Sequence, residues 1–213
     1  MTTLLIIRHG NTDANLKGIY AGHTDAMLTD VGIKQAELVC NYVFNNYKVD
    51  AIYASDLTRA IETAKPLAKM LDLEINIDAE LKEMYGGEWE GKKFLDLPSL
   101  YPEDFSVWQN DVGHSRCTGG ESYEEVCNRA FRAIERIAKS NIGKTVAIVS
   151  HGGYIRGLEC AVRGVDLKDM ASIPYVANAS VSVITYDNKK LKMQSAGFND
   201  FLGTLNTEMP KGI

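Results

Sequence analysis

Short apolar runs alternate along the chain with longer stretches that have helical periodicity. The apolar runs are brief and bounded by turn residues, which is typical of buried strands. They predict strands at residues 3–7, 51–54, 74–77, 145–150 and 180–186. This alternation of strand and helix indicates an α/β domain built on a largely parallel sheet.

Three long segments have the spacing of amphipathic helices. In the first, apolar residues recur every three or four positions from Ile33 to Tyr47, and Thr29 precedes them as a helix cap. The second is predicted from about residue 57 to residue 70. The third begins near Ser122, where Ser-x-x-Glu forms a capping box, and ends at Gly143.

Two further segments depart from this alternation. A turn at residues 187–188 followed by residues 191–195 predicts a final antiparallel edge strand. Residues 92–120 contain two prolines and an uneven pattern, so we interpret them as an insertion over one face of the sheet. We expect residues 1–213 to form a single domain that carries this insertion.

Composition and charge narrow the function classes. With 45% hydrophobic and 24% charged residues, the chain has the composition of a globular protein. The net charge of -5 argues against nucleic-acid or membrane-surface binding, which both depend on clustered positive charge. The sequence has no membrane-span pattern or secretion-signal pattern, so we expect a cytoplasmic protein. The four cysteines form no Cys-x-x-Cys pair, which removes the usual zinc spacing.

Three predicted strands end on side chains that can carry chemistry. Arg8 and His9 follow the first strand, Arg59 lies shortly after the second, and His151 follows the strand at 145–150. The carboxyl ends of parallel strands meet at one edge of a sheet, which is where ligands bind in open α/β folds. We therefore expect these arginines and histidines to converge on a local cationic site.

A phosphate group suits such a site. Guanidinium forks bind phosphate oxygens bidentately and keep their charge at physiological pH. A histidine held near arginines is biased toward its neutral, nucleophilic form, so it can accept a phosphoryl group that water later releases. The departing alkoxide then needs a proton, which arginine cannot supply.

The loop LKEMYGGEWEG at residues 81–91 offers an acid for this step. Its carboxylates are Glu83, Glu88 and Glu90. Glu83 follows the apolar Leu81 near the end of an element, so we expect it to be partly buried and to act as the proton donor. The other two carboxylates remain competitors for this role.

Seven motifs extend these observations over about residues 3–187. They are RHGNTDAN (8–15), AGHTDAMLTDVG (21–32), ASDLTRAIETA (54–64), LKEMYGGEWEG (81–91), GGES (119–122), VSHGGYIRGL (149–158) and NASVSVITYD (178–187). In this order they resemble the histidine phosphatase superfamily, in its phosphoglycerate-mutase-like branch. The resemblance implies a three-layer fold, with helices on both faces of a mostly parallel sheet and the 92–120 insertion over the active site.

The resemblance also implies a phosphomonoesterase that acts on small phosphorylated metabolites through a covalent phosphohistidine. His9 is the implied nucleophile, and Arg8, Arg59 and His151 are the implied ligands of the phosphoryl oxygens. Glu83 matches the proton donor of the family.

Further implied contacts complete the site. Asn15 would help to bind the phosphate, and the backbone near Gly22 and Gly152 would border the pocket. Neither a metal nor another cofactor is implied, because arginines and histidines supply the positive charge that magnesium supplies in other phosphoryl-transfer enzymes. The expected partner is a small phosphate ester. The sequence leaves the oligomeric state open, a homo-oligomer included.

Other functions stay open at this stage. Cofactor-dependent mutases carry a tyrosine where this chain has Gly86, and a longer insertion with paired arginines where residues 92–120 contain only Arg116. A phosphoglycerate mutase is therefore the weaker alternative. A non-catalytic phosphate-binding module is a third, although it should have lost His9 or Glu83. Among hydrolases, a broad-specificity phosphatase and an α-ribazole-phosphate phosphatase are equal candidates.

Aromatic residues around the insertion have two interpretations. They could line a pocket for the leaving group, but aromatic side chains in a packed insertion more often belong to the core. These residues are Tyr85, Trp89, Phe94 and Trp108. We expect His114, in the same insertion, to lie at the surface.

Overall fold

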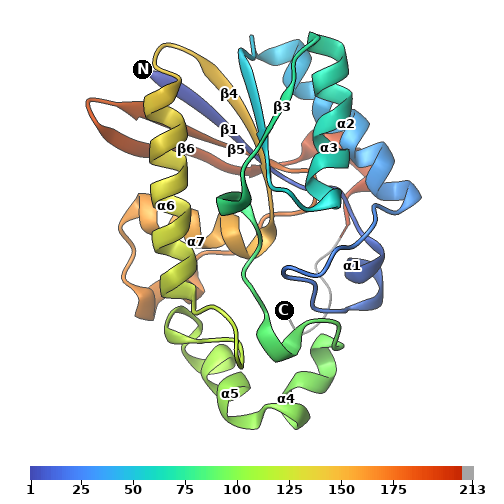
Figure 1. The fold of residues 1–213 in the computed structure, drawn as a ribbon, viewed down its shortest axis with the longest axis vertical. Helices are drawn as coiled ribbons and strands as arrows, with labels where there is room; N and C mark the ends of the chain where they lie inside the picture. The colour runs from blue at the N-terminus through green and yellow to red at the C-terminus, as the bar shows by residue number, and fades with distance from the viewer. Residues whose placement is uncertain (208–213) are drawn as a thin grey trace.

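A six-stranded sheet forms the centre of the computed structural model, which describes residues 1–207 (Figure 1). The order across the sheet is β3-β2-β4-β1-β5-β6. The strands are β1 (Thr2–Arg8), β2 (Ala51–Ala54), β3 (Ile75–Ile77), β4 (Thr145–Ser150), β5 (Val181–Asp187) and β6 (Lys190–Phe198).

The first four strands of this order run parallel, and β5 and β6 are antiparallel to their neighbours. Ile6 of β1 pairs with Ile148 of β4 on one side and with Ser182 of β5 on the other, so β1 is central. The predicted α/β class and largely parallel sheet are confirmed. The edge strand β6 is longer than predicted, because it continues through an irregular register against β5.

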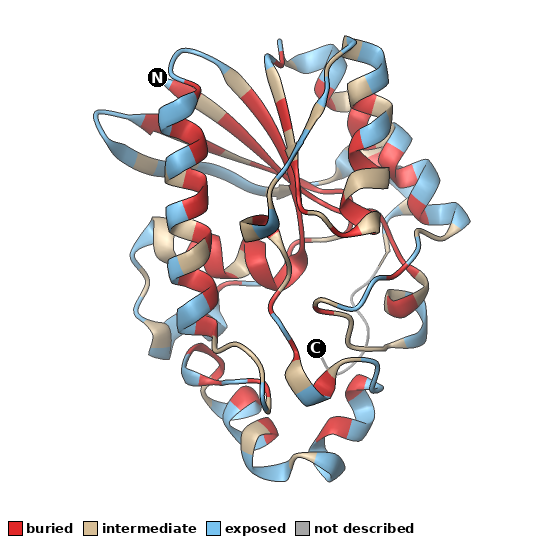
Figure 2. Ribbon diagram, viewed as in Figure 1, coloured by how far each residue is buried: buried red, intermediate tan, exposed pale blue. Residues whose placement is uncertain are grey.

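Helices cover both faces of the sheet, and the alternation of side chains along β1 explains why. Leu4 and Ile6 pack with α6 (Tyr123–Ser140) and α7 (Gly152–Arg163). Leu5 and Ile7 pack on the opposite face with α2 (Asp30–Asn46) and α3 (Thr58–Leu71). Because both faces are buried, β1 is a continuous apolar run, as is usual for a parallel strand (Figure 2).

The predicted helix starts are confirmed, and one predicted end is wrong. The Thr29 hydroxyl accepts the Gly32 N–H at the start of α2, and Ser122 forms the capping box of α6. However, α6 ends at Ser140 rather than at Gly143. The Asn141 side-chain amide donates to the Ile137 carbonyl at 2.9 Å, which satisfies a last-turn acceptor and ends the helix. Helix α7 was not predicted, because its first turn contains two glycines.

The 92–120 segment folds into short helices at the end of the molecule below the carboxyl edge of the sheet (Figure 1). They are α4 (Leu97–Leu100) and α5 (Pro102–Asn110), and the prolines occupy first-turn positions, where their missing N–H costs nothing. Phe94, Phe105 and Trp108 join a third apolar cluster there.

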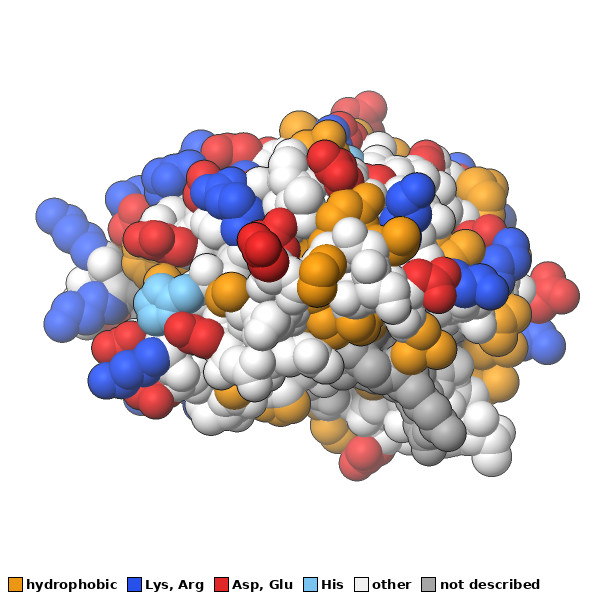
Figure 3. Space-filling view, turned by 90° about the horizontal axis from the view of Figure 1, so that it is seen from below, with side chains coloured by type: hydrophobic (Ala, Val, Ile, Leu, Met, Phe, Trp, Pro, Cys, Tyr) orange, Lys and Arg blue, Asp and Glu red, His pale blue; other side chains and the backbone are white. Residues whose placement is uncertain are grey.

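The face seen from below carries hydrophobic side chains between charged ones (Figure 3). Exposed apolar residues include Leu16 of α1 (Asp13–Lys17) and Leu100 of α4. Across residues 1–207, none of the helices combines the length and the apolarity that crossing a bilayer requires.

The capping box of α6 generates a stability prediction. Ser122→Ala removes the hydroxyl that accepts the Glu125 N–H at 3.2 Å, so we expect a loss of about 0.5–2 kcal/mol in the free energy of unfolding. Urea denaturation followed by circular dichroism measures this change. The exposed Ser140→Ala, at the other end of the same helix, is the control and should leave the midpoint unchanged.

Candidate active site

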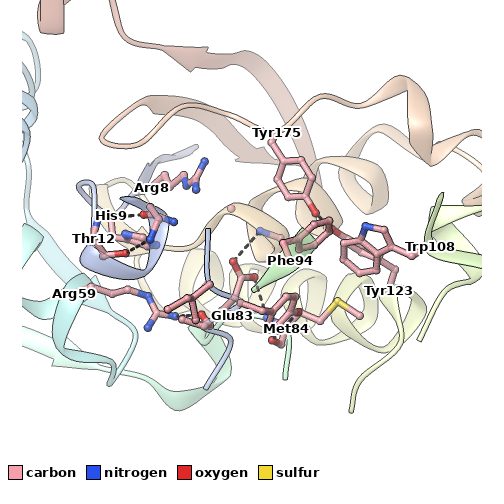
Figure 4. Close-up of a pocket in the computed structure, with 16 residues that line it drawn as sticks. Arg8, His9, Thr12, Arg59, Glu83, Met84, Phe94, Trp108, Tyr123 and Tyr175 are labelled. Atoms are coloured by element: carbon pink, nitrogen blue, oxygen red, sulfur yellow. Dashed lines mark hydrogen bonds between the residues drawn. The ribbon is translucent and has the colours of Figure 1, made fainter. Parts of the chain in front are cut away.

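The side chains predicted to converge come together at the carboxyl edge of the sheet (Figure 4). Arg8, His9 and Arg59 line a cavity whose open space, including its mouth, is about 640 Å³, and His151 lies behind Arg59. Arg8 is the last residue of β1, His9 follows it, and Arg59 lies in the first turn of α3. Glu83 comes from the loop after β3 and lies between these residues and an aromatic wall.

His9 is buried, and its ring is fixed by the backbone next to it. Nδ1 lies 2.7 Å from the Gly10 carbonyl oxygen, which can only accept, so Nδ1 carries the proton. Nε2 therefore carries the lone pair. Burial, together with the charges of Arg59 and Arg8, holds the pKa of His9 well below its usual value. The ring is thus neutral and nucleophilic near pH 7.

Arg59 is also buried, and neutral acceptors hold its guanidinium. Its two terminal nitrogens donate to the backbone carbonyls of Ala21, Gly22 and Thr24 at 2.7–3.0 Å. Its Nε donates to Nδ1 of His151 at 3.1 Å. These bonds engage four of the five guanidinium N–H groups, and their neutral acceptors leave the positive charge in place.

His151 lies behind Arg59 and is fully buried. Because its Nδ1 accepts from Arg59, its Nε2 carries the proton and donates to the Ser55 hydroxyl at 2.8 Å. The rings of His9 and His151 are 5.1 Å apart between centroids. The cavity lining does not include His151, so its expected contact with the phosphoryl group stays a prediction.

Arg8 lies against the start of α7. One terminal nitrogen donates to the Val176 carbonyl at 2.6 Å. A Cβ at Gly152 would lie 3.1 Å from the Arg8 Cζ, so the missing side chain allows the guanidinium to approach the helix. Gly152 is among the residues that line the cavity.

The N-terminus of α7 orients Glu83. Its carboxylate accepts the N–H groups of Gly153 and Tyr154 at 2.9 and 2.8 Å. A Cβ at Gly153 would lie 2.7 Å from Glu83 Oε1, so this glycine is needed for the contact. Arg129 of α6 donates to the carbonyls of residues 80, 82 and 83, which fixes the backbone that carries Glu83.

The other predicted site residues have distinct places. Asn15 lines the cavity, and its side-chain oxygen accepts from the Thr12 N–H and from Asn178. Its amide N–H groups are therefore the part that can donate to a ligand. Gly22 lies behind Arg59 rather than in the cavity lining. Of the three carboxylates in the 81–91 loop, only Glu83 lines the cavity.

Aromatic side chains form the wall opposite the arginines (Figure 4). Phe94 and Trp108 belong both to the third apolar cluster and to the cavity lining, so both interpretations of them hold. Trp89 is only core, and Tyr85 is exposed. The wall also includes residues that sequence reasoning missed because no motif marks their side chains as functional: Tyr20, Tyr123 and Tyr175.

The other two histidines, His23 and His114, lie outside the cavity lining. His114 is exposed, as predicted, and its Nδ1 lies 2.9 Å from the Asp111 carboxylate. Nε2 of His23 contacts the Glu83 carbonyl at 3.0 Å, outside the cavity lining. Across the part of the chain that the structure describes, His, Cys, Asp and Glu form no cluster of three or more suited to a metal ion.

Comparison with known proteins agrees with this geometry. The family model for branch 1 of the histidine phosphatase superfamily matches residues 4–199. The chain belongs to this superfamily. Phosphoserine phosphatase 1 of Hydrogenobacter thermophilus is 32% identical over 213 residues, which cover 100% of both chains. The adenosylcobalamin/alpha-ribazole phosphatase of Escherichia coli is 34% identical over 167 residues, which cover 78% of this chain and 82% of the relative.

A solved structure extends the comparison to the fold. Bacillus stearothermophilus YhfR superposes with a TM-score of 0.90 at 29% identity, covering 95% of this chain and 100% of that one. The family prediction and the phosphoglycerate-mutase-like fold are thus confirmed. This histidine phosphatase is an enzyme that hydrolyses phosphate monoesters of small metabolites through the phosphohistidine intermediate general to the family.

The two kinds of histidine environment predict opposite titrations. Hydrogen bonding to Asp111 raises the pKa of His114, whereas burial and then Arg59 lower that of His9. We expect His114 to take up a proton as the pH falls toward 6.5, and His9 to stay neutral well below that value. NMR titration of the imidazole resonances, assigned with His9→Asn and His114→Gln, measures both. A His9 that protonates at or above the pH of His114 would contradict this reading of the site.

Proposed function

We propose that His9 is the nucleophile of this phosphatase and that Glu83 is its acid. Nε2 of His9 forms a bond to phosphorus as the ester P–O bond breaks, and Glu83 gives its proton to the leaving alkoxide. Glu83 then removes a proton from water, which attacks phosphorus and releases orthophosphate from His9. The observation that carries this assignment is a neutral His9 beside Arg8 and Arg59, with one carboxylate facing it across the cavity.

Arg8 and Arg59 hold the phosphoryl oxygens in this proposal. Their charges oppose the negative charge that the oxygens carry in the transition state. Asn15 adds a neutral donor from its amide. We assign His151 the role of orienting Arg59. Because both of its ring nitrogens are engaged in hydrogen bonds, the ring does not take up a second proton.

One observation favours hydrolysis over mutase activity. Arg116, the single arginine of the 92–120 segment, is exposed and paired with Glu125 at 2.8 Å. It therefore does not offer the cavity a cation that could hold the carboxylate of a phosphoglycerate. The cations among the described lining residues are Arg8 and Arg59, both at the phosphate end.

The lining also supports a class of substrate. Beyond Glu83 the cavity is walled by aromatic rings, with Tyr123 and Tyr175 joined through their hydroxyls at 2.5 Å. An apolar or planar leaving group would bury its surface there, whereas a carboxylate would lose water without gaining a cation. We therefore propose esters of apolar or ring-bearing alcohols as substrates. Of the esters named for its relatives, α-ribazole phosphate fits this class better than phosphoserine does.

The nucleophile is tested by phosphate release in EDTA. We expect the wild-type protein to hydrolyse p-nitrophenyl phosphate without added metal, and His9→Ala to lose the activity. Rapid quenching at alkaline pH should trap a phosphohistidine in the wild-type protein and not in the variant. Equal turnover by His9→Ala would reject the assignment.

The acid is tested by the leaving group. Gly153→Ala places a Cβ 2.7 Å from the Glu83 carboxylate and displaces it. Because p-nitrophenolate leaves without a proton, we expect kcat to fall about a hundredfold for an alkyl phosphate and much less for p-nitrophenyl phosphate. Glu83→Gln should reproduce this pattern. Equal losses on both esters would argue against Glu83 as the acid.

The substrate class is tested with esters of comparable alkyl leaving groups. We expect kcat/KM for phenethyl phosphate to exceed that for phosphoserine by about tenfold or more. Phe94→Ala should reduce this preference, whereas Tyr101→Ala, in the same segment but outside the cavity lining, should keep it. A preference for phosphoserine or 3-phosphoglycerate would overturn the class.

A further inference from the structure

Backbone hydrogen bonds surround the carboxylate of Glu90, although this residue lies outside the cavity lining. Its carboxylate accepts four backbone N–H groups, from Gly22, His23, Thr24 and Gly86, at 2.8–3.1 Å. It does not line the cavity, so it does not touch a substrate bound there. Burial raises the pKa of Glu90, but hydrogen bonds from Thr24, His23 and Gly86 outweigh it and lower the pKa, so the carboxylate is ionised at neutral pH.

Two glycines make room for this carboxylate. A Cβ at Gly22 would lie 2.5 Å from Glu90 Oε1 and 2.2 Å from the Met84 carbonyl oxygen. A Cβ at Gly86 would lie 3.1 Å from the same Oε1. The backbone thus closes around the carboxylate from two separate segments, which a side chain at Gly22 would prevent.

The segment of residues 21–24 presents its other polar groups to Arg59. The three carbonyls that accept from the guanidinium come from Ala21, Gly22 and Thr24. The N–H groups of this segment therefore point to an anion, and its carbonyls point to a cation. The plane of the Arg59 guanidinium depends on the path of this backbone.

A second carboxylate ties the same segment to the helix that carries Arg59. Asp25 accepts the Thr58 N–H at 3.0 Å and also the Thr58 hydroxyl, at the N-terminus of α3. The segment is thus fixed to α3 at one end and to Glu90 along its N–H side. Arg59 has little freedom to turn once both contacts are made.

We propose that Glu90 is a positioning residue of the phosphatase: by folding residues 21–24 around its carboxylate, it sets the guanidinium of Arg59 in the orientation that receives the phosphoryl group. This inference rests on the proposed role of Arg59 as a phosphoryl ligand. It assigns a function to the second carboxylate of the GEWEG sequence, which is distinct from the acid role of Glu83.

Glu90→Gln provides the test, with Glu88→Gln as the matched control two residues away on the exposed side of the loop. The amide replaces one acceptor oxygen with an NH2 group that faces N–H donors. We expect kcat/KM to fall about a hundredfold, as when one preorganised donor is lost, with similar losses for p-nitrophenyl and alkyl phosphates. Competitive inhibition by orthophosphate should weaken about tenfold, and Glu88→Gln should match the wild-type protein.

Two further measurements distinguish a loss of folding in the Glu90 variants from a loss of Arg59 positioning. Thermal unfolding gives the folded fraction, and the inhibition constant for orthophosphate reports only on folded molecules. Glu90→Asp keeps the charge on a shorter side chain, so it should recover part of the phosphate affinity that Glu90→Gln loses.

The inference is overturned by a folded Glu90→Gln with wild-type kcat/KM and phosphate inhibition, or by a loss that only follows the unfolded fraction. If the wild-type protein releases no phosphate from any ester, the proposed function fails first. In that case, calorimetric binding of orthophosphate to Glu90→Gln and Glu88→Gln tests the role of Glu90 independently of catalysis.

Discussion

The uncancelled positive charge of the buried Arg59 is the constraint on which the site depends. A buried guanidinium needs partners for its N–H groups, and a carboxylate partner would cancel the charge that a phosphate dianion requires. The structure meets both needs with carbonyl oxygens and one imidazole nitrogen. The N–H that Arg59 donates to Nδ1 in turn fixes the tautomer of His151, and the charge of Arg59 helps to keep His9 neutral. Arg59 thus acts on both histidines, on His151 through a hydrogen bond and on His9 through its charge, which adds to the effect of burial.

The start of α7 organises the opposite half of the site. Its first two residues are glycines, which let Arg8 and Glu83 approach the helix from two sides. The N–H groups of this first turn hold the Glu83 carboxylate, as helix N-termini hold anions generally. Glu83, the proposed acid, and Arg8, a proposed phosphate ligand, are therefore placed relative to one helix. In the proposed mechanism, changes to the aromatic wall would alter which alcohol fits without moving the groups assigned to breaking the P–O bond.

Sequence reasoning reached the parts of this arrangement that follow from periodicity and sheet geometry. The convergence of Arg8, His9 and Arg59 could be predicted, because parallel strands present their carboxyl ends at one edge. The position of His151 behind Arg59 could not, since it depends on which side-chain partners each ring nitrogen finds. Helix α7 was missed because glycines dominate its first turn, although their absent side chains are what the site requires.

The aromatic wall could not be predicted from the sequence for a different reason. Tyr175 comes from a segment without regular secondary structure, and its place beside Tyr123 depends on tertiary packing between distant parts of the chain. Composition and spacing carry no signal for such a contact. The two prolines and the uneven pattern predicted an insertion but not its helices, in which both prolines occupy first-turn positions.

The position of β1 in the sheet has a consequence for how the enzyme acquires its activity during synthesis. His9 directly follows β1, which pairs with β4 and β5, whose residues lie more than 130 positions later in the chain. Its neighbours are therefore distant in sequence, and closing such long loops slows folding. A nascent chain therefore cannot bury His9 beside Arg59 and His151 in the completed sheet until β4 and β5 have been made.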